Sequence, residues 1–134
     1  LGWIFGPIQR NVVHLHNHDR AAGYLEFKQA RVRWFLSINY DLIPDEIKAK
    51  DQRTFRSIVV DDEELEFSNG FFDLHTRSYE NIIEGSGFSL KDAMHSVQIV
   101  HDIRNAETSP LKGDYHPLLK HKLIVHPFRK ERRK

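Results

Sequence analysis

Hydrophobic and polar residues alternate along much of the chain, from Ile8 to Phe67. A period of two is typical of β-strands that bury one face. The alternation predicts three strands, over residues 13–18, 20–28 and 31–39. The links between them, near residues 17–20 and 28–30, are short enough for hairpins. The three strands are therefore expected to run antiparallel.

The chain then leaves this pattern over residues 41–53, which are polar and have Pro44 near their start. This segment is interpreted as an excursion with room for one helical turn. Alternation returns afterwards and predicts a fourth strand over residues 54–60 and a short fifth strand over residues 65–67. The acidic residues 61–63 form the turn between these two strands.

The second half of the chain changes to a helical period. Residues 72–84 predict one helix, which ends at Gly85. A second helix begins at Ser89, which has capping-box spacing to Asp92, and ends before Pro110. Spacings of three and four give this helix an apolar stripe of Leu90, Ala93, Met94, Val97, Val100 and Ile103. Strands followed by helices predict an α+β fold, an open-faced, largely antiparallel mixed sheet with helices on one face.

The helices are expected to cover the apolar side of the sheet. The other side would carry a mixture of aromatic and charged residues with few lysines, which is typical of protein–protein interfaces. Exposure to water is the alternative, because antiparallel sheets often leave one face uncovered. The residues expected on this side are His14, His16, His18, Tyr24, Glu26, Arg31, Arg33, Phe35, Ser37 and Asn39.

Composition and charge divide the chain into a domain and a tail. A length of 134 residues suits one domain with a core, expected over residues 1–119. Residues 120–134 carry seven of the twenty basic residues and one of the nineteen acidic residues, so this tail has a charge of +6 and the rest −5. A basic tail can bind nucleic acid or an anionic membrane, and the alternative is a solvated chain end.

The sequence lacks the features of several other classes of protein. The sequence has no cysteine, and therefore no disulfide or thiolate metal site. No apolar run reaches the ~18–20 residues that span a bilayer, and cytoplasmic location is expected. The chain opens with "LGWIFGP" and no methionine, which we interpret as the end of an apolar helix that began upstream in a longer protein.

The stretch "HLHNHD", residues 14–19, concentrates three of the nine histidines. On a strand, His14, His16 and His18 would share one side, but His14 and His18 would lie roughly 13 Å apart. One metal ion could use at most an adjacent pair, so no metal site is expected. A zinc protein that uses His14 and His16 is the alternative. The Gly85-Ser86-Gly87 run lacks the context of a dinucleotide fingerprint.

Several separated runs resemble one enzyme family. These runs are "NVVHLHNHDRAAGYLEFKQARVRWFLSIN" (11–39), "SNGFFDLHTRSYENIIEGSGF" (68–88), "SVQIVHDIRNA" (96–106) and "LKGDYHP" (111–117). They are similar to the C-terminal domain of bacterial UDP-N-acetylglucosamine-uronic acid 3-dehydrogenases, members of the Gfo/Idh/MocA oxidoreductases that serve lipopolysaccharide O-antigen synthesis. The resemblance implies a sheet domain of the glyceraldehyde-3-phosphate-dehydrogenase-like C-terminal type. The NAD-binding Rossmann domain and all catalytic residues would then lie outside this chain.

Position and chemistry suggest which residues of this chain would serve such a domain. We expect the chain to contact the UDP-sugar through Arg33, Ser37, Asn39, His75 and Tyr79. An arginine suits a uronate or diphosphate, because its planar fork grips oxyanions, although Arg33 could instead pair with Glu26. A homodimer or homotetramer is expected through His14, His16, His18, Tyr24, Glu26, Arg31 and Phe35. We expect no membrane contact, no metal and no cofactor bound by this chain alone. The alternative function is a non-enzymatic interaction module whose basic tail binds nucleic acid.

Overall fold

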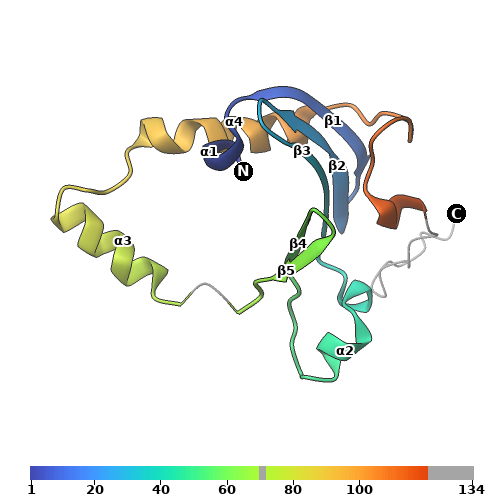
Figure 1. Ribbon diagram of the computed structural model, residues 1–134, viewed down its shortest axis with the longest axis horizontal. Coiled ribbons are helices and arrows are strands. Elements are labelled where there is room, and N and C mark those ends of the chain that lie inside the picture. Colours follow the sequence, from blue (N-terminus) through green and yellow to red (C-terminus); the bar gives the residue numbers. More distant parts are fainter. Residues whose placement is uncertain (70–71, 121–134) are drawn as a thin grey trace, which may run out of the picture. The chain divides into compact units, whose positions relative to one another are not determined.

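A computed structural model of the chain describes residues 1–69 and 72–120 (Figure 1). The described residues form two units. The first contains residues 1–39 and 90–120, and the second contains residues 40–89. Antiparallel strands and several helices make up the chain, so the α+β prediction is confirmed at that level. The basic tail beyond Lys120 lies outside the described residues.

The first unit is built on a three-stranded sheet. Strands β1 (Ile8–His16), β2 (Arg20–Phe27) and β3 (Arg31–Ser37) pair in the order β1-β2-β3, and both pairs are antiparallel. Both predicted hairpins are therefore confirmed. The first turn forms because the Asn17 side chain accepts the backbone N–H groups of Asp19 and Arg20, at 3.2 and 3.0 Å. This is a turn that asparagine stabilises locally.

A β-bulge at His14 changes the face assignment of β1. Val13 pairs with Gly23, whereas Leu15 pairs with Ala22, so His14 is the extra residue. Paired residues in an antiparallel sheet share a face, and a bulge reverses the alternation that follows it. Val13 and Leu15 consequently lie on opposite faces, and His16 takes the face of Val13. The prediction that His14, His16 and His18 share one side of a strand is wrong, and His18 lies beyond the strand end.

Two helices belong to the same unit as this sheet. These are α1 (Gly2–Phe5) and α4 (Leu90–Asn105), and α4 packs against β1. Gly2 leaves space for His95, because a Cβ at this position would come 2.5 Å from the imidazole. The Trp3 indole donates to the carbonyl of Asp92 at 3.4 Å. These contacts join the N-terminal helix to the first half of α4.

The prediction of which α4 residues are buried is wrong. His95, Ile99 and Ile103, at spacings of four, are partly buried. Of the predicted stripe, Ile103 alone is partly covered, and Leu90, Met94, Val97 and Val100 are more than half exposed. Periodicity identified the helix correctly but selected the neighbouring side.

The core of the first unit lies around β2. Val13, Ala22, Leu25 and Phe27 are all at most 3% exposed. Phe5 of α1 covers one end of this core, with its ring centroid 6.0 Å from that of Phe27. The core therefore draws on strands β1 and β2 and on the N-terminal helix.

The second unit contains short elements. They are a 3₁₀ turn (Tyr40–Leu42), α2 (Asp45–Lys48), β4 (Ser57–Val60), β5 (Glu63–Glu66) and α3 (Leu74–Ile83). β4 and β5 form a separate two-stranded antiparallel sheet, so the expectation of one sheet for all strands is wrong. Asp61 and Asp62, with φ of 50° and 66°, make the tight turn between them. Gly85 has φ of 75° beyond α3, as expected for a helix stop.

Candidate functional site

The chain's own C-terminal segment lies against β1 and the polar face of the sheet. We call residues 109–120 the strap; they end in a 3₁₀ helix over Pro117–Lys120. The Ser109 N–H donates to the carbonyl of Val13 at 2.7 Å. Beside it, His14 Nδ1 lies 3.3 Å from the Ser109 carbonyl and Nε2 lies 3.2 Å from the Asp114 carbonyl. His14, the bulge residue, therefore contacts the strap at two positions, Ser109 and Asp114.

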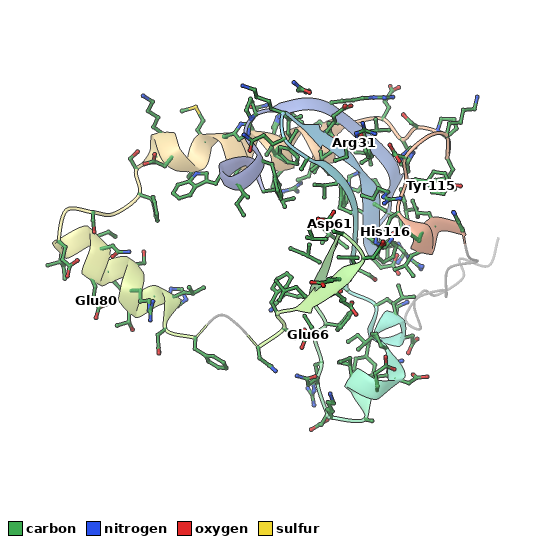
Figure 2. The ribbon with its side chains drawn as sticks, in the orientation of Figure 1. Arg31, Asp61, Glu66, Glu80, Tyr115 and His116 are labelled. Carbon is green, nitrogen blue, oxygen red and sulfur yellow. The ribbon has the colours of Figure 1, made fainter. Side chains whose placement is uncertain are left out.

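Aromatic rings continue the contact between the strap and the sheet (Figure 2). The ring of Tyr115 meets His14 edge-on at 6.1 Å between centroids, and His116 lies 5.6 Å from Phe35. The Lys120 ammonium sits 5.9 Å from the centroid of the Tyr115 ring. These contacts bring together two sequence runs, "HLHNHD" and "LKGDYHP", that lie far apart along the chain.

Burial perturbs two ionisable groups on this face. Tyr24 is 5% exposed, and burial, followed by the carboxylates of Glu26 and Asp114, raises the pKa of its phenol above 10. Partial burial lowers the pKa of His116 below 6.5, and the nearby charge of Arg33 lowers it further. Both shifts favour neutral side chains where the strap meets the sheet.

Three charged residues form a cross-strand row on the polar face, next to the β2–β3 turn; we call it the charged row. Arg10, Glu26 and Arg31 are cross-strand neighbours there, with Glu26 in the middle. A shallow hollow of about 360 Å³ opens at this end of the sheet; its lining includes Glu26, Lys28 and Arg31. The lining of the hollow is mostly polar, unlike the mostly apolar clefts that bury small ligands.

The opposite end of the sheet holds a compact buried polar cluster. Asp19, Arg20 and Asn39 are 3%, 8% and 3% exposed. Arg20 Nε donates to Asp19 Oδ1 at 3.1 Å, and Arg20 Nη2 lies 3.0 Å from Asp19 Oδ2, so two nitrogens of the guanidinium fork face the carboxylate. Burial by itself would raise the pKa of the Asp19 carboxyl. The hydrogen bond and the charge of Arg20 outweigh burial, with a smaller contribution from His18, and the net pKa lies below 3.8.

This cluster contains two of the residues predicted to contact substrate. The Ser37 hydroxyl donates to the Asp19 carbonyl at 3.3 Å and accepts the Asn39 N–H at 3.0 Å. The Ile38 N–H donates to the same Asp19 carbonyl at 3.0 Å. Arg33 lies further along β3 and is exposed. His75 and Tyr79 lie on α3 in the second unit, and both are exposed.

The residues predicted for a subunit interface fall into three groups. Glu26 and Arg31 lie in the charged row next to the β2–β3 turn. Phe35 and His14 contact the strap, and Tyr24 is buried within the chain. His16 and His18 are exposed and lie outside the polar face. A role of these residues in self-association stays a prediction.

Sequence reasoning missed the Asp19–Arg20 pair and the strap. The signal for the pair was present in "NHDR", where Asn17 begins an asparagine turn next to an acid and a base. The strap gave no periodic signal. Only the family resemblance drew on its "LKGDYHP" run.

The described residues fit neither a metal site nor a dinucleotide site. Residues 1–69 and 72–120 contain no group of three or more histidine or acidic side chains placed to hold a metal ion. Dinucleotides in Rossmann folds bind at a glycine-rich turn between a parallel strand and a helix. In the described part of the chain both sheets are antiparallel, and Gly85 and Gly87 stand between helices α3 and α4. These residues do not fit a nicotinamide dinucleotide. Within the same residues, no helix has the length and apolarity needed to cross a membrane.

Comparison with known proteins gives a specific likeness. No protein-family model matches the chain. The crystal structure of the WlbA (WbpB) dehydrogenase from Thermus thermophilus with NAD and UDP-GlcNAcA matches 87% of the chain at 41% identity and a TM-score of 0.80. The same dehydrogenase with NAD and alpha-ketoglutarate matches 84% at 42% identity and a TM-score of 0.78. The chain spans 36–38% of the length of these proteins. The resemblance predicted from the sequence is confirmed, and the nucleic-acid alternative is not favoured.

Proposed function

We propose that the chain is the C-terminal, substrate-binding part of an NAD-dependent dehydrogenase that oxidises the C3 hydroxyl of UDP-N-acetylglucosamine-uronic acid. The observation that carries the proposal is 41% identity over 87% of the chain to a dehydrogenase crystallised with NAD and UDP-GlcNAcA. Identity of this level over most of a chain supports a shared ancestor and a shared role. The complete protein would act in the cytoplasm, in lipopolysaccharide O-antigen synthesis.

The cofactor would bind elsewhere in the complete protein. NAD would accept the hydride from C3 of the sugar. The described residues do not fit the dinucleotide, so this chain would hold and orient the substrate while another part holds NAD. No catalytic residue is assigned to this chain.

Arg33 would bind a negatively charged part of the substrate. Arg33 is exposed, and its planar guanidinium offers five N–H donors. The uronate and the diphosphate of the sugar nucleotide are oxyanions that a planar fork binds well. Ser37 and Asn39, at the end of β3, are further proposed substrate contacts in the first unit. His75 and Tyr79, both exposed on α3, are proposed substrate contacts in the second unit.

The complete protein would also self-associate as a homodimer or homotetramer. The charged row of Arg10, Glu26 and Arg31 alternates in sign, so it can pair with a copy of itself. Sedimentation of the complete protein at micromolar concentration tests this proposal. A monomer at high micromolar concentration would remove it.

Turnover by the complete gene product tests the activity. Incubation with NAD and UDP-N-acetylglucosamine-uronic acid should raise the NADH absorbance. UDP-N-acetylglucosamine, which lacks the carboxylate, should give a much smaller rise. The 134-residue chain alone should give none. If the complete protein is folded and produces no NADH from the uronate, the proposed function is wrong.

A further inference from the structure

The function proposed above assigns no role to the buried Asp19–Arg20 pair. It lies at the end of the sheet where β3 finishes, and Arg20 is the direct cross-strand partner of Ser37. We propose that Asp19 and Arg20 are positioning residues of the sugar-nucleotide site: their ion pair fixes the β1–β2 turn, and this turn sets the hydrogen-bonding role of Ser37. The inference rests on the proposed function and assigns to Ser37 the kind of substrate group that it can bind.

The first step is the attachment of the β3 end to the turn. One backbone carbonyl, that of Asp19, accepts both the Ile38 N–H at 3.0 Å and the Ser37 hydroxyl at 3.3 Å. The position of this carbonyl therefore decides where Ser37 and Ile38 lie. No other strand borders β3 on its outer side among the described residues, so its end is held laterally only from the side of β2, by the pairing of Ser37 with Arg20 and by the Asp19 carbonyl of the turn.

The second step is the attachment of the turn itself. Asn17 accepts two backbone N–H groups with its side chain, and its own N–H donates to the Arg20 carbonyl at 3.0 Å. Arg20 Nε then donates to Asp19 Oδ1 at 3.1 Å, and Nη2 lies 3.0 Å from Oδ2, so two nitrogens of the guanidinium fork face the two carboxylate oxygens. Both side chains are nearly excluded from water. A buried pair of this kind holds one geometry, because separation would leave charges without partners in a poorly solvating environment.

The third step concerns what Ser37 can still bind. A serine hydroxyl has one donor and two acceptor positions. The Asp19 carbonyl takes the proton, and the Asn39 N–H occupies one acceptor position. The remaining position can only accept. Ser37 is exposed, so it would accept a hydrogen bond from a sugar hydroxyl or from the acetamido N–H, and it would not bind an oxyanion. Arg33 would bind the oxyanions instead.

The test is steady-state kinetics of the complete gene product. Arg20→Lys keeps the charge but loses the fork, and the double variant Asp19→Asn, Arg20→Gln removes both charges without stranding one. Each should raise the KM for UDP-N-acetylglucosamine-uronic acid about tenfold, change kcat by less than about twofold and leave the KM for NAD unaltered. Asp45→Asn is the matched control, because it breaks the exposed Asp45–Lys48 pair, whose atoms lie 3.2 Å apart, and should change none of these values.

Amide hydrogen exchange supplies a readout that does not depend on activity. The Ile38 and Asn39 amides should exchange several-fold faster in Arg20→Lys than in the parent protein, and at the parent rate in Asp45→Asn. If the variants fold, and either these amides or the KM for the sugar nucleotide stay unchanged, the inference is overturned. Absence of turnover in the parent protein would instead overturn the proposed function, and the exchange result would still decide whether the pair fixes β3.

Discussion

The indole of Trp34 lies directly over Gly23, its cross-strand neighbour on β2. A Cβ added to Gly23 would come 2.8 Å from Cζ2 of Trp34 and 2.2 Å from the Val12 carbonyl oxygen. Neither distance occurs in real structures, so the glycine is required for space and not for backbone conformation. The absence of one side chain thus lets a large ring cover the middle of the sheet.

Gly23→Ala should therefore lower the free energy of unfolding by about 2 kcal/mol, a usual cost of overpacking. Thermal unfolding of the complete protein is the measurement. Gly85→Asn is the control, because nothing lies within 4 Å of that position and asparagine tolerates a φ of 75°. A Gly23→Ala protein as stable as the parent would contradict the close contact.

The ion pair at the β1–β2 turn should make stability depend on acid. The pKa of Asp19 lies below its ordinary 3.8 in the folded protein. A depressed folded pKa contributes stability that is present above the unfolded pKa and is lost as the pH falls through the folded value. The stability difference between the parent and Asp19→Asn should be largest above about pH 5 and should shrink below about pH 4. A difference that is constant from pH 3 to 7 would contradict the assignment.

Tyr24 should dominate the alkaline behaviour of the first unit. Its pKa is raised above 10 by burial and by two nearby carboxylates, so the unfolded chain loses the phenolic proton first. Stability should then fall as the pH rises above 10. Tyr24→Phe should weaken this alkaline loss of stability, which denaturant unfolding at a series of alkaline pH values would measure. Tyr79→Phe, on the exposed α3, is the control and should leave the loss as it is in the parent protein.

The strap should depend on His14 for its attachment. His14→Ala removes two side-chain contacts to strap carbonyls and the ring contact to Tyr115. Amide exchange of residues 109–120 should accelerate about tenfold, because each lost hydrogen bond contributes about 1 kcal/mol. His16→Ala is the matched control, since His16 is exposed and takes the other face of the sheet. Equal exchange in both variants would show that backbone contacts alone hold the strap.

Arg33 offers a direct test of the proposed substrate contact. Arg33→Ala in the complete protein should weaken binding of the sugar nucleotide by about tenfold or more, as expected for loss of a charge-assisted hydrogen bond. Calorimetric titration is the measurement. Arg104→Ala, at an exposed position of α4 with no proposed role, is the control and should leave the affinity unchanged. Unaltered affinity in Arg33→Ala would remove this residue from the site.

Alternation and turn chemistry were sufficient to predict the three strands of the first unit. They failed at His14, because a bulge leaves no trace in a hydrophobic pattern and reverses the face of the residues that follow it in the same strand. This is why Leu15 and His16 do not lie where alternation places them. The α4 error has a related cause. The sequence has apolar residues on two adjoining sides of this helix, and the contacts with Gly2 and the rest of the first unit select the side of His95 and Ile99.

The candidate site was predictable where single residues mattered and not where contacts between distant segments did. Arg33 and Ser37 could be proposed from strand position and chemistry. The role of Ser37 depends on a backbone carbonyl of Asp19, and the covering of Phe35 depends on His116. Neither contact has a periodic or motif signature, because backbone acceptors look alike in every sequence.

The attachment of the strap to β1 has a consequence for synthesis of the protein. His14 and Ser109 are 95 residues apart, and the neighbouring Val13 pairs with Thr108 in an isolated parallel bridge. Contacts between such distant residues slow folding, since a long loop must close first. During translation, β1 emerges long before the segment that completes it. The contact between Ser109 and the edge of β1 cannot form until residue 109 has left the ribosome, and an exposed strand edge in that interval favours pairing with other chains.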